Sequence, residues 1–365
     1  MYGFVLFRQL VIALVPGASA QAISRDEHLF IASSISTAFE ENPVRILTNV
    51  LFGCGLFLAT ALPANAQTFP TKPIQIIVTA PAGGALDILT RSVGQKLQER
   101  LGQPVIVENR PGAAGSLGTA IGAKAPADGY TLTLVYSSHS INPHLYASLP
   151  YDTLKDFSPV VLMASLPMGL FVNPSVPAKS VSEFVALAKA NPGKINYGSS
   201  GNGSVSHILG AMFTSATSTE LIHVPYRGSV PAKTDLLAGR VQAMFADVDV
   251  VQQNIKSGQL RALALATDSR LQGYEDIPTF AEAGVNGLVV ASQVGLIVPA
   301  NTPPDVVNKL NREIVAILKD PEMAQRVRDR GMTVVASTPA EYDKVIRDDY
   351  ARFGEIIRKA NIKMD

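Results

Sequence analysis

Residues 74–101 read IQIIVTAPAGGALDILTRSVGQKLQERL, and this stretch contains the pattern that decides the fold. The apolar run at 74–78 predicts a buried strand, and the loop after it ends in Gly83 and Gly84. A helix is expected over 85–101, because leucine and valine recur there every three or four residues on one face. A strand, a loop of small residues and a helix in this order are typical of an α/β fold with a mostly parallel sheet.

The same alternation of short apolar runs and helical patterns continues to the end of the chain. Further strands are expected at 105–107, 131–136, 195–197, 242–246, 261–266 and 293–298. Further helices are expected over 114–125 and 205–215, after the capping box at 180–183, and from 302 and 338 onward. No internal repeat or low-complexity linker separates these elements, so two domains would have to be joined by chain crossings through the sheet.

Composition and charge limit the classes of function. The 365 residues are 47% hydrophobic and 17% charged, with 31 Lys and Arg against 30 Asp and Glu. A net charge of +1 argues against a nucleic-acid-binding protein, which usually carries a basic excess. The apolar content excludes wholesale disorder, and the length suits two domains with their own cores.

The first 66 residues are predicted to be a leader. Residues 50–62 form an uncharged apolar run preceded by Arg45, and Ala64-Asn65-Ala66 offers an A-x-A cleavage site. The run is shorter than the roughly 20 residues of a membrane span. We therefore expect residues 44–66 to be a signal peptide that is cleaved after Ala66, with the mature protein outside the cytoplasmic membrane. An uncleaved anchor helix is the alternative.

A second export-like stretch lies upstream of this signal. Residues 10–15 are apolar and are followed by Ala18-Ser19-Ala20. Two export signals in tandem serve no evident purpose, so we expect residues 1–43 to be an artefact of gene calling, with translation beginning at Val44. The only cysteine, Cys54, would leave with the leader. The mature protein is therefore expected to rely on its core and not on disulfides.

Motifs for metal binding and catalysis are missing from the sequence. The histidines after the leader, His139, His144, His207 and His223, do not follow HExxH or similar spacing. No G-x-S-x-G, S-x-x-K or P-loop motif occurs. We therefore predict no catalytic residue, no metal and no cofactor. The enzymatic alternative is an exported hydrolase that uses a serine with His207 and Asp247.

Three strand ends carry loops of small and polar residues. These loops are Gly83-Gly84, Ser137-Ser138-His139-Ser140 and Ser199-Ser200-Gly201-Asn202-Gly203-Ser204. Helix N-termini carry unpaired N–H groups and a partial positive charge, and glycine lets the backbone approach a ligand. Because such loops meet at the C-terminal ends of strands, they predict a site that holds a carboxylate without a basic side chain. Each loop taken alone is equally compatible with an ordinary turn.

Three charged residues near these loops have two readings each. Asp87 lies in the first turn of its helix, where it either interacts with the helix dipole or contacts a ligand amine or hydroxyl. Asp247 ends an apolar strand and has the same two options. Arg227 either pairs with a ligand carboxylate or fixes Asp87 or Asp247 in place, and the structural role is favoured.

A series of collinear motifs runs through nearly the whole chain after the leader. They are Phe69-Pro70-Thr71-Lys72-Pro73-Ile74, Pro81-Ala82-Gly83-Gly84 with Asp87, Val107-Glu108-Asn109-Arg110-Pro111-Gly112-Ala113, Asp128-Gly129-Tyr130-Thr131-Leu132, Tyr151-Asp152 with Lys155-Asp156-Phe157, Asn191-Pro192-Gly193-Lys194, Tyr197-Gly198-Ser199-Ser200-Gly201, His223-Val224-Pro225-Tyr226-Arg227-Gly228 and Pro278-Thr279-Phe280-Ala281-Glu282-Ala283-Gly284. With these motifs, residues 70–361 resemble the Bug-type periplasmic solute receptors of tripartite tricarboxylate transporters. No single motif is specific, whereas the ordered set is highly specific.

The resemblance implies a two-lobed periplasmic-binding fold of type II, in which each lobe is a mostly parallel sheet flanked by helices. Lobe 1 would comprise residues 67–170 and 293–365, and lobe 2 would comprise 171–292. In such receptors a loop from each lobe holds the ligand carboxylate. Carried over here, the ligand-binding residues are Ala82, Gly83, Gly84, Asp87, Ser199, Ser200 and Gly203, with Asp247 as the candidate specificity residue. The loop after the third strand adds Ser138.

The resemblance also implies a periplasmic receptor and not an enzyme. Its partners would be a small carboxylate and the membrane permease subunits of the transporter, with no nucleic acid. A ligand-sensing role with a sensor kinase as partner is the alternative. Two departures from the family pattern bear on the ligand. A Trp usually precedes the Gly of the returning strand, where this chain reads Ser292-Gln293-Val294-Gly295, and two prolines often precede the Gly-Gly pair, where it has Pro81-Ala82.

Overall fold

The computed structural model describes residues 69–363. The predicted leader, with Cys54 and the cleavage site after Ala66, lies outside the described residues. The strands are β1 (Ile74–Val78), β2 (Val105–Asn109), β3 (Thr131–Tyr136), β4 (Phe157–Val172), β5 (Ile195–Ser199), β6 (Leu221–Pro225), β7 (Ala243–Asp247), β8 (Arg261–Leu265), β9 (Ala291–Pro299) and β10 (Thr333–Val334). The helices are α4 (Ala85–Leu101), α5 (Ser116–Ala123), α6 (Ser138–Ile141), α7 (Val181–Ala190), α8 (Val205–Thr217), α9 (Ser229–Leu237), α10 (Val248–Lys256), α11 (Pro304–Leu318), α12 (Pro321–Asp329) and α13 (Pro339–Lys359).

These strands form one mixed sheet with the order β2-β1-β3-β9-β4-β7-β5-β6, and β8 and β10 pair additionally with β4. β1 is parallel to β2 and β3, and β5 is parallel to β6 and β7. β4 and β9 are antiparallel to their neighbours. The α/β class expected from the sequence is confirmed, but the two returning strands make the sheet mixed instead of mostly parallel.

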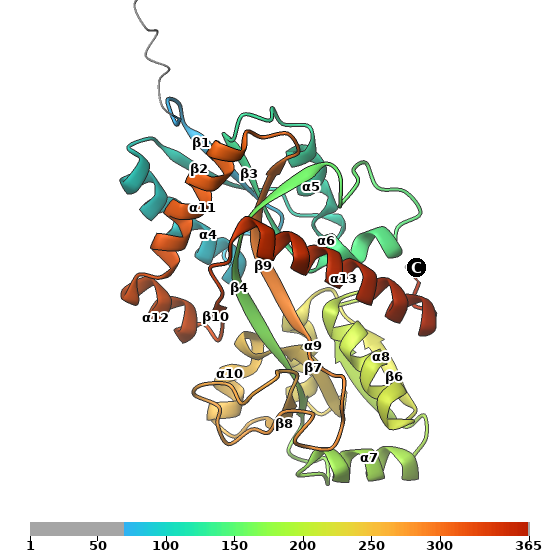
Figure 1. Cartoon of the computed structure of the whole chain (residues 1–365). Coiled ribbons are helices and arrows are strands. Elements are labelled where there is room, and N and C mark those ends of the chain that lie inside the picture. Colours follow the sequence, from blue (N-terminus) through green and yellow to red (C-terminus); the bar gives the residue numbers. More distant parts are fainter. Residues whose placement is uncertain (1–68, 364–365) are drawn as a thin grey trace, which may run out of the picture. The chain divides into compact units, whose positions relative to one another are not determined.

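The strand β4 connects the two ends of the sheet (Figure 1). Its first part pairs with β9 as far as Pro167, opposite Ala291, and its last part pairs with β7 from Met168 onward. This 16-residue strand was not predicted from the sequence, because Pro159 and Pro167 interrupt an otherwise apolar run. The strand accommodates Pro159 by a register shift against β9 between Pro159 and Val161.

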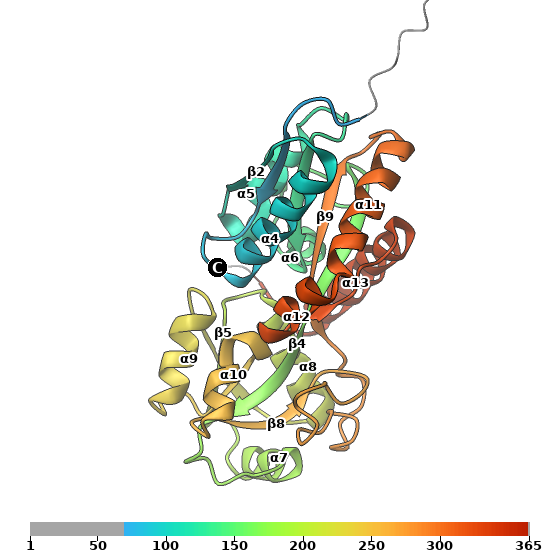
Figure 2. The same ribbon diagram turned by 90° about the vertical axis from the view of Figure 1, so that its left-hand side faces the viewer.

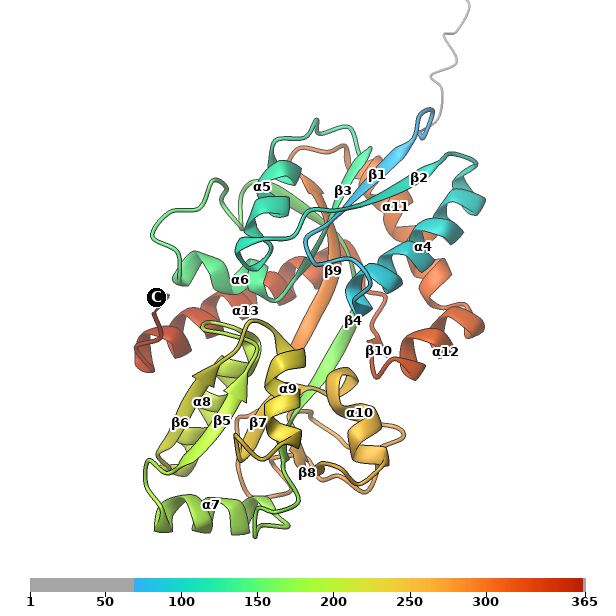
Figure 3. The same cartoon turned by 180° about the vertical axis from the view of Figure 1, so that it is seen from behind.

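Separate apolar cores lie at the two ends of β4. At one end, β1, β3 and β9 bury a cluster with α4 and α11 that includes Ile76, Leu134 and Leu310. Figure 2 shows the helices α4 and α11 at this end of the sheet. At the other end, α7 and α8 cover one face of the sheet through Phe184 and Phe213. The helices α9 and α10 cover the opposite face, as Figure 3 shows from behind. The loops that follow β1, β5, β6 and β7 therefore face the region between these cores.

The predicted bounds of helices are most accurate where the apolar periodicity extends over many residues. The helix over 85–101 begins and ends at the expected residues, with Gly102 in the left-handed conformation as its C-cap. The expected helix over 114–125 is shorter, because Ala113–Gly115 forms a 3₁₀ turn before α5 begins at Ser116. Within the described part of the chain, no helix has both the length and the apolar character needed to span a membrane.

Candidate functional site

A cavity of about 510 Å³ lies between the loops that follow the strands of both ends of the sheet. Its lining residues from the β1–β3 end are Ala85, Leu86, Ala114, Tyr136, Ser138, Ile141, Asn142 and Leu145. From the β5–β7 end they are Ser200, Asn202, Gly203, Ser204, Val205, Ser206, Arg227, Gly228, Ser229, Asp247, Asp249 and Val250. The long strands β4 and β9 contribute Leu166, Ser292 and Val294. The volume suits a small organic molecule.

Besides the short helix α6 and the acid-bearing N-terminus of α10, three helix N-termini reach this cavity. The first residues of α4, α8 and α9 line it, at Ala85, Val205 and Ser229. The N-caps of α4 and α9 are Gly84 and Gly228, which provide no side-chain cap. The first N–H groups of these helices therefore keep their hydrogen-bonding capacity and their partial positive charge. Such an arrangement favours an anionic group in the cavity.

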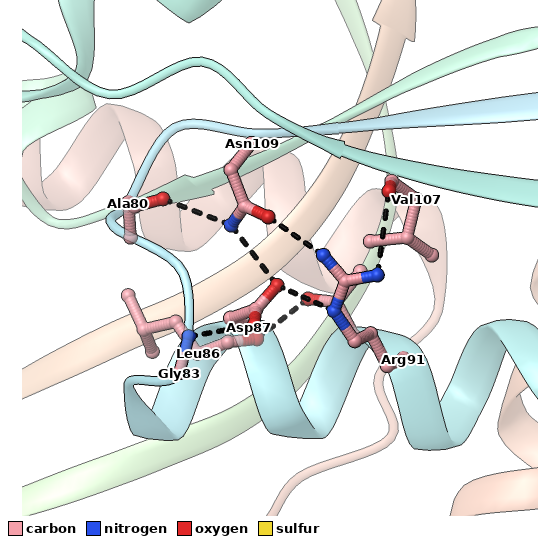
Figure 4. A network of polar contacts seen from close by, with 8 residues as sticks. Ala80, Gly83, Leu86, Asp87, Arg91, Val107 and Asn109 are labelled. Atoms are coloured by element: carbon pink, nitrogen blue, oxygen red, sulfur yellow. Dashed lines mark hydrogen bonds and ion pairs between the residues drawn. The ribbon is translucent and has the colours of Figure 1, made fainter.

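The Asp87 carboxylate fixes the loop before α4 (Figure 4). Its Oδ2 accepts a 2.8 Å hydrogen bond from the backbone N–H of Gly83, and its Oδ1 accepts a 2.9 Å hydrogen bond from Asn109. Arg91 forms a 3.0 Å ion pair with the same carboxylate. Burial opposes ionisation of Asp87, but the hydrogen bonds from Gly83, Arg91 and Asn109 outweigh it and lower its pKa. Asp87 is thus a positioning residue for the loop and does not line the cavity.

A network of serine hydroxyls orders the loop between β5 and α8. The backbone N–H of Ser200 donates to the hydroxyl of Ser206 at 3.0 Å, and the Ser204 hydroxyl donates to the carbonyl of Gly201 at 2.7 Å. The Ser204 side chain also caps α8 by accepting a hydrogen bond from the N–H of His207. These contacts hold the hydroxyl groups and the first turn of α8 against the cavity.

Behind this loop lie two stacked histidines, His207 and His223, with ring centroids 3.7 Å apart. The Ser199 hydroxyl lies 2.6 Å from Nε2 of His223, and Nδ1 of His207 accepts a hydrogen bond from the N–H of Gly203. Burial lowers the pKa of His207 to about 4, and burial together with His207 lowers the pKa of His223 to about 3. Both rings are therefore neutral at pH 7.

The triad of the hydrolase alternative is not assembled. It required a serine, His207 and Asp247 in hydrogen-bond contact, but Ser199 contacts His223, and Asp247 accepts its hydrogen bond from Ser292. The sequence contains no nucleophile elbow, and the hydrogen bonds of Ser199 and Asp247 contradict the proposed set of residues.

Asp247 and Asp249 bring two carboxylates to the cavity from the β7–α10 junction. The Ser292 hydroxyl donates a 2.6 Å hydrogen bond to Oδ1 of Asp247. Burial, assisted by the charge of Asp249, raises the pKa of Asp247 to about 7. Burial likewise raises the pKa of Asp249 to about 6. Burial thus disfavours the ionised form of both carboxylates.

Arg227 is exposed and lines the cavity. The structural role favoured for it from the sequence is wrong, because Arg91 pairs with Asp87 and Ser292 hydrogen-bonds Asp247. The other role, pairing with a ligand carboxylate, stays a prediction. Among residues 69–363, no group of three or more His, Cys, Asp or Glu side chains is arranged to hold a metal ion.

The structure brings some of the sequence-predicted residues together at the cavity and leaves others beside it. Ser138, Ser200, Gly203 and Asp247 line the cavity. Ala82, Gly83, Gly84, Asp87 and Ser199 are not part of the lining. Four further lining residues were not predicted from the sequence, namely Tyr136, Asn142, Ser206 and Asp249. Tyr136 and Asp249 could have been found, because one ends a predicted strand and the other lies two residues after Asp247.

Comparison with known proteins identifies the family. The model of the TctC family, described as the tripartite tricarboxylate transporter family receptor, matches residues 89–362. The chain belongs to this family. The protein BugT of Bordetella pertussis is 36% identical over 323 residues, which cover 87% of this chain and 99% of BugT.

Solved structures of similar proteins share the fold of this TctC-family chain. A Rhodopseudomonas palustris protein solved with adipate is 32% identical, with a TM-score of 0.74 over 81% of this chain and 100% of that one. MatC from the same species, solved with bound malate, is 28% identical, with a TM-score of 0.70 over 79% of this chain and 100% of MatC. The periplasmic binding protein BugD is 31% identical, with a TM-score of 0.70 over 81% of this chain and 100% of BugD.

Proposed function

We propose that this protein is a periplasmic receptor that binds a small organic carboxylate in the 510 Å³ cavity and delivers it to the permease of a tripartite tricarboxylate transporter. Export would follow from the predicted signal peptide, with cleavage after Ala66. Membership of the TctC family supports the receptor role. Two similar proteins were solved with adipate and with malate, which are both carboxylates.

Within the chain itself, one observation supports this proposal: the N-termini of three helices line the same cavity. The N-termini of α4, α8 and α9 offer backbone donors and partial positive charge from both ends of the sheet. A carboxylate that accepted hydrogen bonds from α4 and from α8 together would link these two ends. Binding would then favour the closed arrangement of the receptor.

We further propose that the two lobes, 67–170 with 293–365 and 171–292, rotate about the long strands. The change of partners along β4, from β9 at Pro167 to β7 at Met168, supports a hinge at this point. The other crossing strand, β9, passes the same level at Ala291 and Ser292. Hinge closure about a few residues at strand crossings is a common movement of ligand-binding proteins.

A thermal-shift screen tests the proposed function. The purified protein is mixed with di- and tricarboxylates, amino acids and aromatic acids, and the corresponding uncharged amides serve as controls. A ligand at a hundredfold excess over its dissociation constant stabilises the folded state by about 2.7 kcal/mol, which corresponds to a rise in Tm of about 5 °C. A screen in which no carboxylate raises the Tm more than its amide contradicts the proposal.

A further inference from the structure

The last helix, α13, is anchored at both ends of the sheet. Its first half buries Tyr342 and Ile346 in a cluster with residues of β3 and β9. Its second half buries Phe353 and Ile357 in the core that α7 and α8 cover. Figure 1 shows the helix running between the two ends of the sheet, where it contacts β4, α6 and α8. The helix α13 therefore connects the two ends in addition to the strands β4 and β9.

The ring of His144 lies against α13 where the helix passes from one cluster to the other. Nε2 of His144 donates a 2.8 Å hydrogen bond to the carbonyl of Tyr350, and the centroids of the two rings are 4.4 Å apart. A Cβ atom at Gly354 would lie 2.5 Å from Cε1 of His144. Glycine is less favourable than alanine in a helix interior. The space that the histidine ring occupies explains why glycine is present at this position.

His144 belongs to the segment that forms one wall of the ligand cavity. The helix α6 continues into a 3₁₀ turn that ends at His144, and Asn142 and Leu145 line the cavity. The Asn142 amide donates a 3.1 Å hydrogen bond to the carbonyl of Ala114, which fixes the start of the turn. From Leu145 to Pro150, no side chain forms a hydrogen bond within residues 69–363. The hydrogen bond from His144 is thus the last side-chain hydrogen bond that fixes the wall before this stretch.

Leu145 is the cavity residue that this hydrogen bond positions. The Leu145 side chain lies against Gly203 of the loop between β5 and α8, on the other side of the cavity. Because Leu145 directly follows His144 in the chain, a shift of the His144 ring changes where Leu145 meets that loop. The acceptor of the His144 hydrogen bond is in α13, which is anchored at both ends of the sheet. The position of Leu145 therefore depends on α13.

We propose that His144 is a positioning residue for ligand binding. Through its hydrogen bond to Tyr350 and its contact with Gly354, it holds the cavity wall at Leu145 in the place that the bound ligand requires. This inference rests on the proposed function and adds a residue that does not itself line the cavity. A wall that is held before the ligand arrives avoids the cost of ordering it on binding, so the hydrogen bond contributes to affinity.

Two substitutions of His144 test the inference by calorimetric titration with the carboxylate that gives the largest thermal shift. His144→Phe keeps a ring against Gly354 but cannot donate a hydrogen bond, and it should weaken binding about fivefold or more. His144→Gln keeps an N–H donor and should bind within about twofold of wild type. A His144→Phe protein that binds as tightly as wild type overturns the inference. A His144→Gln protein that loses as much affinity as His144→Phe overturns it as well.

A control separates positioning from a loss of stability. Ile314→Val shortens a buried side chain of α11 in the apolar cluster of the β1–β3 end and should keep the wild-type affinity. Urea denaturation gives the free energy of unfolding of each variant. If the affinities of the His144 variants and of Ile314→Val simply follow their stabilities, His144 has only a structural role and the inference is overturned.

Substitution of Gly354 keeps the inference testable if His144→Phe does not fold. Gly354→Ala places a methyl group where the histidine ring lies and should weaken binding. Combined with His144→Ala, it should weaken binding no further than His144→Ala alone, because the overlap is gone. Losses of affinity that add up fully in the double variant overturn the inference. Failure of every carboxylate to bind wild type overturns the proposed function itself, whereas equal binding by wild type and the variants overturns only the role of His144.

Discussion

The hydroxyl of Ser292 donates a 2.6 Å hydrogen bond to Oδ1 of Asp247. The two residues belong to β9 and β7, which lie on either side of β4, so this contact links the returning strand to the strand that ends at Asp247. It lies at the level where β4 changes partners. The hydrogen bond therefore lies both at the proposed hinge and in the wall of the cavity.

Replacing Ser292 tests what this hydrogen bond contributes. Ser292→Ala leaves a buried carboxylate oxygen without its donor, which should reduce the free energy of unfolding by about 1–3 kcal/mol at pH 8. Urea denaturation measures the difference, with Ser182→Ala as the control at an exposed position. A loss no larger than that of the control would show that water replaces the hydroxyl without cost.

The pH dependence of stability follows from the raised pKa of Asp247. Burial, together with the charge of Asp249, raises that pKa to about 7 in the folded protein, whereas an unfolded Asp titrates near 3.9. Between these values the folded state binds more protons, so this group lowers stability as the pH rises from about 4 to about 7. Asp247→Asn removes this effect, and its stability relative to wild type should be higher at pH 8 than at pH 5. Denaturation curves at both pH values measure the change.

Other charged groups near this carboxylate limit the choice of control. Asp249 lies in the first turn of α10, for which Asp247 is the N-cap residue, and both Lys233 of α9 and Tyr274 lie within electrostatic range of Asp249. Asp305→Asn is distant from all of these groups in the fold and should show no such pH dependence. An Asp247→Asn protein whose relative stability is the same at pH 5 and pH 8 argues against a raised pKa.

Gly203, in the loop between β5 and α8, lies against Leu145 on the other side of the cavity. A Cβ atom at this position would overlap the side chain of Leu145, and the residue has a φ of +69°. Gly203→Ala should therefore weaken ligand binding several-fold, because the Leu145 side chain must move away from the added methyl group and the backbone of the loop is strained. Gly258→Ala is the matched control, since Gly258 has a φ of +72° and nothing within 4 Å of its Cβ position. Calorimetry on both variants separates overlap from backbone strain.

A second substitution tests whether Leu145 is the cause. In the double variant Gly203→Ala with Leu145→Ala, the overlap is relieved, and affinity should recover in part. If both single glycine variants weaken binding equally, backbone strain explains the effect and the contact with Leu145 does not.

Replacing Asp87 should have the opposite pH dependence from replacing Asp247, because its hydrogen bonds lower its pKa. Its hydrogen bonds from Gly83, Arg91 and Asn109 outweigh burial and lower the pKa of Asp87, so the stability it contributes is present above the unfolded pKa and is lost in acid. Asp87→Asn should therefore destabilise the protein more at pH 7 than at pH 3. Thermal unfolding at both pH values measures this, and an equal loss at both would contradict the ionic role.

The sequence could predict the elements whose pattern is local. The strand at 74–78 and the helix at 85–101 follow from periodicity and from the glycines that bound them. The strand β4 could not be predicted in this way, because two prolines lie inside it and its pairing with β9 and β7 is tertiary. Propensity contains no information about such long-range pairing.

The site was predictable in its loops and not in its side-chain contacts. Glycine and serine after strand ends indicated where a ligand would approach, and Ser200 and Gly203 do line the cavity. The partners of Asp87 and Asp247 depended on residues far along the chain, Asn109 and Ser292. These pairings arise from sheet register, which a single sequence does not specify.

Calorimetric titration of the best carboxylate from the screen into wild type, Gly203→Ala and Gly258→Ala shows whether the cavity binds a small carboxylate. We predict saturable binding at one site per chain, weakened several-fold by Gly203→Ala and nearly unchanged by Gly258→Ala. Absence of saturable binding to any carboxylate, or equal binding by all three proteins, would contradict it.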